Sequence, residues 1–204
     1  MELTPIIAAL IAGGGGGALI SAIQNFFFEK RRLKKQFIEE QLRKLYGPVY
    51  YKVLVNEKLF EIARSHNKAT DTAYFSEEKN WSRDQSTQEH LTKISKDSIE
   101  IQNSYIDEVK ANNEEIKLIL DANYSYVDPE DTEHFVKFLQ DYHRLHKEYQ
   151  GKLRTDLHVY FELEKTIGEI SWMDVKFANC IKEKFRSKQE TLRALAYCDP
   201  ASLI

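Results

Sequence analysis

A long uncharged segment near the N-terminus most constrains what this chain can fold into. No Asp, Glu, Lys or Arg occurs between Glu2 and Glu29, a run of 26 residues. A helix needs about 20 predominantly apolar residues to cross the hydrocarbon core of a bilayer. The run therefore predicts that residues 1–28 form a transmembrane anchor. The three phenylalanines at its end are expected near the membrane interface, where aromatic rings are favoured.

Five basic residues follow this run just after Glu29 and predict how the anchor is oriented. They are Lys30, Arg31, Arg32, Lys34 and Lys35. Because basic residues stay on the cytoplasmic side, we expect a single-pass protein with its N-terminus outside and its C-terminal domain cytoplasmic. A cleaved secretory signal carries its basic residues before the apolar run, so the anchor is expected to be retained. The same five side chains are expected to contact anionic lipid.

Five consecutive glycines, Gly13–Gly17, lie within the uncharged run. Gly13 and Gly17 have the G-x-x-x-G spacing that lets two membrane helices approach closely. We therefore predict a helix–helix contact at these two residues, with a homo-oligomer as the result. Two alternatives stay open: the glycines are a flexible point in a lone helix, or residues 5–28 form a buried hairpin of a soluble protein. Uncharged runs of this length are rare in soluble domains, which favours the membrane span.

Apolar residues recur at three- and four-residue steps through the rest of the chain, as in amphipathic helices. Residues 29–46 are expected to continue the anchor as a basic juxtamembrane helix, and residues 47–204 to form a cytoplasmic helical bundle. Gly47-Pro48 predicts a break, because glycine suits the end of a helix and proline the first turn of the next. A second helix is expected to end near His66. The polar residues 67–85 are expected to form a loop.

Three further patterns predict helix starts. Ser86-Thr87-Gln88-Glu89 has the capping-box pattern, and its helix is expected to reach Leu120, with or without a break near residues 111–113. Asp128-Pro129-Glu130 places a side-chain acceptor before a proline, and residues 171–174 look like the cap of a last helix. No stretch shows sustained two-residue alternation. The predicted fold class is therefore all-α, with one N-terminal transmembrane helix and an antiparallel bundle of about four long helices.

The sequence carries no pattern that points to a catalytic, cofactor or metal site. His143 and His146 lie near each other on a helix, but Glu-x-x-His, which di-iron bundles require, does not occur. Cys180 and Cys198 are expected to be free, structural thiols. No phosphate-binding loop or nucleophile elbow is present. The net charge of -3 disfavours nucleic acid as a partner. We therefore expect no enzyme activity, cofactor or metal.

Two short stretches carry a resemblance to other proteins. They are Leu45-Tyr46-Gly47-Pro48-Val49-Tyr50 and Asp128-Pro129-Glu130-Asp131. Their order after an N-terminal span resembles a group of uncharacterised bacterial membrane-anchored helical proteins with a Leu-Tyr-Gly-Pro-Leu-Tyr-like motif. The resemblance implies this architecture and the bacterial inner membrane, and it implies no activity. Tyr46, Gly47, Pro48 and Tyr50 are expected to form a structural corner between the anchor and the bundle.

These features favour one function over two alternatives. An anchor joined to an aromatic-rich bundle without a catalytic set predicts a membrane-tethered protein-interaction module at the cytoplasmic face. Its partner would be another protein or a second copy of the chain. The first alternative is a bacterial or prophage defence or exclusion factor that acts on the membrane through an oligomerising glycine-rich span. The second is a membrane-tethered enzyme with a pocket hidden in the bundle.

Overall fold

The computed structural model describes residues 16–78, 85–148 and 173–197, and within these ranges it contains helices and no strand. The α-helices are α2 (Gly16–Gln41), α3 (Gly47–Glu78), α4 (Gln85–Asn123), α5 (Thr132–Glu148) and α7 (Val175–Tyr197). Three short turns complete the described chain: the π-helical η1 (Leu42–Tyr46) and the 3-10 turns η2 (Tyr124–Tyr126) and η3 (Pro129–Asp131). The all-α class predicted from the sequence is confirmed.

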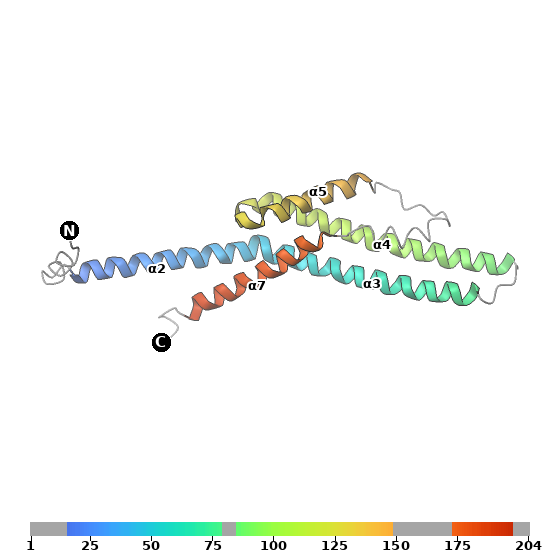
Figure 1. The fold of residues 1–204 in the computed structure, drawn as a ribbon, viewed down its shortest axis with the longest axis horizontal. Helices are drawn as coiled ribbons and strands as arrows, with labels where there is room; N and C mark the ends of the chain where they lie inside the picture. The colour runs from blue at the N-terminus through green and yellow to red at the C-terminus, as the bar shows by residue number, and fades with distance from the viewer. Residues whose placement is uncertain (1–15, 79–84, 149–172, 198–204) are drawn as a thin grey trace.

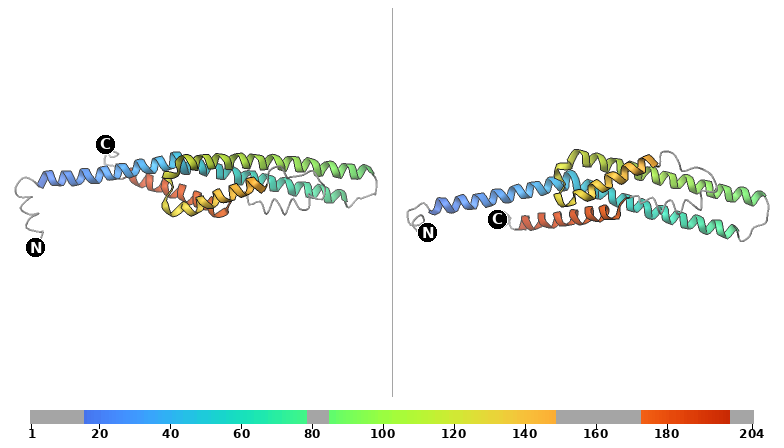
Figure 2. Two further views of the ribbon diagram at one scale, coloured as in Figure 1. Left: turned by 90° about the horizontal axis from the view of Figure 1, so that it is seen from above. Right: turned by 45° about the horizontal axis from the view of Figure 1, so that its top comes forward.

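The molecule is elongated, and its helices overlap mainly in the middle (Figures 1 and 2). α2 projects at one end, while α3 and α4 form a long antiparallel hairpin at the other end. α5 and α7 pack around the middle, and α7 runs back beside α2 in the opposite direction. The four helices that follow the α2 segment therefore do not lie side by side over their whole length, as in a simple four-helix bundle.

The hydrophobic core lies where these helices meet. Its aromatic centre is Phe177 of α7, which stacks on Phe138 at 4.5 Å between ring centroids and meets Phe135 edge-on at 5.5 Å. Such pairs contribute roughly 0.5–1.5 kcal/mol beyond the burial of their area. The buried core residues are Leu45, Tyr46, Val49, Val53, Ile116, Leu120, Phe135, Phe138, Phe177, Ala178 and Ile181. The core thus joins segments that are more than a hundred residues apart in sequence.

The junction between α2 and α3 differs from the predicted break. Gly47 has right-handed helical dihedrals (φ -66°, ψ -55°), and its N–H bonds to the carbonyl oxygen of Leu42, five residues earlier. Pro48 lacks an N–H, so an ordinary helical ladder cannot pass through it unchanged. The wider π-helical turn of η1 accommodates the proline, and the helix axis bends there (Figure 1). The expected helix end at Gly47 is wrong: the backbone stays helical from Gly16 to Glu78.

The loop expected over residues 67–85 is also wrong for most of its length, because α3 continues to Glu78. Two threonines in this polar stretch bond to the helix itself: Thr70 donates to the carbonyl oxygen of His66 at 3.0 Å, and Thr72 donates to that of Lys68. Thr70 is buried beside Ser98 of α4. Packing against α4 therefore keeps a segment of modest helix propensity in the helical state.

Polar side chains set the register of the α3–α4 hairpin. Asn56 of α3 donates to Asn113 at 2.9 Å and accepts from Asn112 at 3.0 Å. Lys52 reaches both Asn112 and Glu115. A buried asparagine pairs well in one alignment only, so it selects that alignment over a slipped one. α4 passes through residues 111–113 without a break, because these asparagines bond across to α3.

The three predicted helix starts have different outcomes in the structure. α4 begins at Gln85, beside the capping-box pattern. Asp174 caps α7, since its side-chain oxygen accepts from the N–H of Lys176 at 3.1 Å. Asp128 precedes η3 as expected, but its carboxylate makes no cap bond there and turns to other helices. Residues 149–172, which include part of the cap pattern expected at 171–174, lie outside the described residues.

Replacing Gly47 tests the π-helical turn. A Cβ added at Gly47 would collide with the backbone carbonyl oxygen of Leu42, whereas one added at Gly17 meets no atom within 4 Å. We expect Gly47→Ala to lower the free energy of unfolding by about 1–3 kcal/mol, because the turn must shift. Gly17→Ala is the control and should be neutral or slightly stabilising, because alanine is the better helix former. Thermal unfolding followed by circular dichroism compares them, and equal stability of the two variants would contradict the turn.

Candidate functional site

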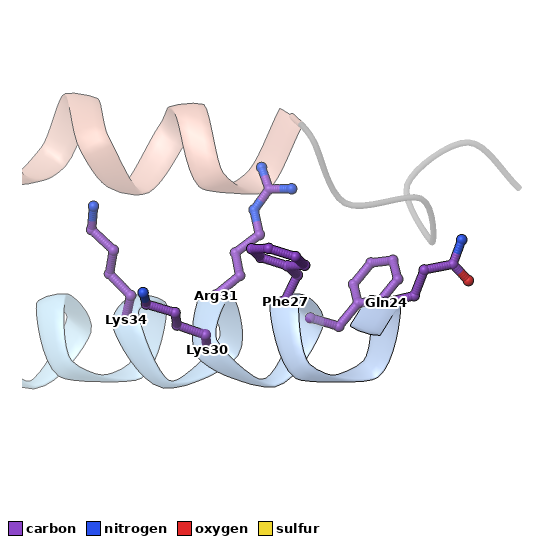
Figure 3. Close-up of a pocket in the computed structure, with 6 residues that line it drawn as sticks. Gln24, Phe27, Lys30, Arg31 and Lys34 are labelled. Atoms are coloured by element: carbon purple, nitrogen blue, oxygen red, sulfur yellow. The ribbon is translucent and has the colours of Figure 1, made fainter. Parts of the chain in front are cut away.

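An open groove lined by cations and aromatic rings lies on α2, beside α7 (Figure 3). Its volume is about 590 Å³. The lining residues are Gln24, Phe27, Phe28, Lys30, Arg31 and Lys34. Figure 3 shows Arg31 and Lys34 pointing from α2 towards α7. We call this feature the α2 groove.

The structure separates the five basic residues that the sequence places after the uncharged run. Lys30, Arg31 and Lys34 line the α2 groove, and Arg32 and Lys35 do not. Arg32 donates from Nε to Glu29 at 2.9 Å, and this contact lowers the pKa of the Glu29 carboxyl. Within the described chain, no ion pair joins Lys30 or Lys34 to an acid. The groove therefore concentrates positive charge on one side of the helix.

Apolar side chains continue from the groove towards the N-terminal end of α2. Phe26 and Phe27 are about two-thirds exposed, and three further side chains are about half exposed: Ile20, Ile23 and Phe28. Gly17 lies on the same projecting segment, and Gly13 lies outside the described residues. None of the described helices has the combination of length and apolar character that a membrane span requires.

A partly buried group of polar residues joins the base of α2 to the rest of the molecule. It consists of Gln41, Tyr46, Asp128, Asp131, Lys184 and Lys188, and we call it the central polar cluster. Gln41 donates to Asp128 at 2.8 Å and to the carbonyl oxygen of Tyr126 at 2.9 Å. Lys188 donates to Gln41 at 2.7 Å and to Asp128 at 2.8 Å.

The second half of the cluster surrounds Tyr46. Its hydroxyl donates to Asp131 at 2.9 Å and accepts from the backbone N–H of Asp128 at 3.2 Å. Lys188 lies over the Tyr46 ring at 4.8 Å from its centroid. Lys184 bonds Glu130 and lies 3.2 Å from Asp131. The two stretches that carry the family resemblance, around Tyr46 and around Asp128, are therefore in direct contact.

The charges of the cluster stabilise one another. Burial by itself would raise the pKa of Asp128, but hydrogen bonds from Lys188 and Gln41 outweigh it and lower that pKa. Burial would lower the pKa of Lys184, but bonds to Glu130 and Asp131 outweigh it and raise that pKa. Burial raises the pKa of the Tyr46 hydroxyl well above its usual value, so this hydroxyl stays protonated. At neutral pH, Asp128 and Lys184 are therefore held in their charged forms and Tyr46 in its neutral form.

The expected corner residues have different surroundings. Tyr46 is fully buried in the cluster, while Tyr50 stacks on Phe185 of α7 at 4.2 Å between ring centroids. Gly47 and Pro48 belong to the continuous helix described above. The two tyrosines therefore connect the bent helix to α7 and to the turn before α5.

The cysteine, histidine and aspartate residues that could be reactive or bind metal lie in surroundings that do not favour such chemistry. Burial, together with Asp131, raises the pKa of the Cys180 thiol to about 12, so the reactive thiolate is scarce at neutral pH. His143 is exposed, and Asp141 pairs with Lys137 and Arg144. Among the described residues, no three His, Cys, Asp or Glu side chains are placed to hold a metal ion. Cys198 and the side chain of His146 lie outside the described part.

The sequence pattern did not single out Gln41, Lys184 and Lys188. Gln41 lies three residues after Ile38 and four before Leu45, both buried, so its place on the apolar face was visible in the spacing. On α7, Lys184 lies three residues after the core residue Ile181, and Lys188 lies four residues after Lys184, so both lie near the core face of the helix. A polar residue at a core position signals a buried contact, but the sequence does not name its partner.

Comparison with known proteins does not assign the chain to a family. No family model, no curated protein and no solved structure matches it. Over the described residues, the fold defines an all-helical protein with a projecting helix α2 and a core tied by a partly buried polar cluster.

The central polar cluster predicts how stability depends on pH. Because the pKa of Asp128 is lowered in the folded state, its contribution is fully present above the ordinary value of 3.8 and is lost as the pH falls through the folded value. Because the pKa of Lys184 is raised, its contribution is present below 10.5 and is lost as the pH rises through the folded value.

Asp128→Asn tests the acidic side of this profile. We expect the variant to lose about 1–3 kcal/mol of unfolding free energy at neutral pH, because Lys188 loses its charged acceptor. The loss should shrink as the pH falls below 3.8, where the parent loses the same contribution. Urea unfolding of the full chain in detergent, repeated across this range, measures both quantities. A difference that stays constant with pH would show that Asp128 is not ionised in the folded protein.

Proposed function

We propose that the chain is a membrane-tethered protein-interaction module without enzyme activity, held at the cytoplasmic face of the bacterial inner membrane. The observation that carries the proposal is the projecting part of α2, where three exposed phenylalanines are followed, after Glu29, by a group of cations. This order matches the side chains found where a helix leaves a bilayer: aromatic rings at the interface, then basic residues in the cytoplasm. Residues 1–28 are the anchor in this proposal.

The link between anchor and bundle favours a tether of fixed direction. α2 passes into α3 without leaving the helical state, and Gln41 at its base bonds to both Asp128 and Lys188. A flexible linker would let the bundle tumble relative to the membrane. The continuous helix and the buried bonds instead favour a bundle that stands at one orientation to the surface.

The outer face of α3 offers a surface for a protein partner. Tyr51, Leu54 and Ile62 are exposed there at spacings of three and eight residues, which places them on one side of the helix. Tyr51 is 62% exposed. Tyrosine is among the residues that supply most of the binding energy at interfaces, so its exposure here favours a contact site. We propose that this face, on the hairpin arm away from the tether, contacts the partner.

Membrane attachment tests the proposal directly. The full chain should stay with the membrane pellet after an alkaline carbonate wash, because an inserted helix resists extraction that removes peripheral proteins. A version lacking residues 1–28 should be soluble and helical. Release of the full chain by the wash would refute the tether and reopen the search for a soluble function. Loss of membrane potential on induced expression would favour the alternative of a factor that acts on the membrane itself.

Site-specific crosslinking tests the partner surface. A photoreactive residue in place of Ile62 should yield an adduct of defined mass in cells, because Ile62 lies on the proposed contact face. The matched control replaces Arg64, an exposed residue of the same helix that lies about 200° around the helix axis from Ile62 and therefore outside the proposed face. Equal adducts at both positions, or none at position 62, would contradict the assignment of this face.

A further inference from the structure

We propose that the α2 groove binds the head group of one anionic phospholipid, with the phosphate at Lys30 and Lys34 and the acyl chains against Phe27 and Phe28. The inference rests on the proposed membrane tether and goes beyond it. General attraction of a basic segment to a negative surface uses all five cations alike. Binding in the α2 groove would instead depend only on the cations that line it.

The placement of charge supports a site of this kind. Lys30 and Lys34 are one helical turn apart, so their ammonium groups lie on one side of α2. Arg31 extends from the same groove towards α7 (Figure 3). The lining contains no acidic side chain, and Glu29 is turned to Arg32 outside it. The groove therefore complements a single negative group, and lysine is a common phosphate ligand in proteins.

The aromatic side chains decide which anion fits. Phe27 is 64% exposed and Phe28 51% exposed, and both lie on the N-terminal side of the cations. The exposed Ile20 and Ile23 continue this apolar surface away from the groove. Towards the N-terminal end of α2, the order of side chains is thus cations, aromatic rings and aliphatic chains. A bilayer presents the matching order of phosphate groups, interfacial region and hydrocarbon. A free phosphate would leave the aromatic part of the groove uncovered.

The groove also continues a helix face that is closed further along α2. Phe27, Arg31 and Lys34 are followed at steps of four and three by Ile38 and Gln41, which are both buried. At Gln41 this face meets α7 through Lys188. Towards the tether the same face is lined by cations and rings, and it is open. A bound head group would cover this open part of the α2 face.

Two double variants that remove the same charge distinguish a groove from diffuse attraction. Lys30→Gln with Lys34→Gln removes two lining cations, and Arg32→Gln with Lys35→Gln removes two that lie outside the groove. The full chain in detergent is titrated with phosphatidylglycerol and, separately, with phosphatidylcholine of the same acyl chains. Native mass spectrometry counts the lipid retained. Circular dichroism confirms that both variants keep the parent helicity.

The parent should retain one phosphatidylglycerol in preference to phosphatidylcholine. Loss of Lys30 and Lys34 should weaken phosphatidylglycerol binding about thirtyfold, since each basic residue near an anionic lipid contributes roughly fivefold. Loss of Arg32 and Lys35 should leave the affinity close to that of the parent. Added inorganic phosphate should not displace the lipid, because it lacks the acyl chains that cover Phe27 and Phe28.

Three results would overturn the inference. An equal loss in both double variants would show diffuse electrostatic attraction, and no loss in either would show that the groove is not used. Displacement by inorganic phosphate would show a simple anion site. The carbonate wash separates this inference from the proposed function. If the parent and both variants stay in the pellet but bind lipid alike, the groove fails and the tether stands. Release of the parent by the wash refutes the tether itself.

Discussion

The contact of Gln41 with Asp128 and Lys188 is the interaction on which the arrangement of the molecule depends. It joins the base of α2, the turn before α5 and the middle of α7. These three segments are far apart in the sequence. Burying an aspartate and a lysine is costly unless each finds its partner, so an arrangement that leaves either group unpaired is strongly disfavoured. The apolar core beneath gathers the helices, while this polar cluster selects one way of assembling them.

The bent helix from α2 to α3 belongs to the same arrangement. Pro48 prevents an ordinary helical ladder, and the π-helical turn brings Tyr46 to Asp131 and Tyr50 to Phe185. Tyr46 is the last residue of this turn and Tyr50 follows it, so the wider turn changes the direction of both side chains relative to those of an unbroken α-helix. The bend therefore aims both tyrosines at the core, and it sets the direction in which the tether leaves the bundle.

The sequence predicted the helices better than the junctions between them. Apolar spacing predicted the all-α class, and the patterns before α4 and α7 marked their starts, with Asp174 as the cap. The predictions failed at Gly47-Pro48 and over residues 67–78, where local signals favoured a break and a loop. In both places tertiary contacts outweigh local preference: Tyr46 is bonded in the core, and Thr70 is buried against α4. For the candidate site, the sequence marked the basic residues as a group, and only the structure separated those that line the groove.

The sequence by itself determined the order of polarity along α2 and the helical character of the chain, because both depend on which residues follow one another. The tertiary structure alone decided the partners of Asp128. Its place before Pro129 suits an N-cap, yet its carboxylate bonds Gln41 and Lys188. A local cap satisfies one backbone N–H, whereas the largely buried ammonium group of Lys188 is best satisfied by a charged acceptor and lies 60 residues away in sequence. The bond to Lys188 therefore outweighs the local cap, and no local pattern around Asp128 could identify Lys188 as its partner.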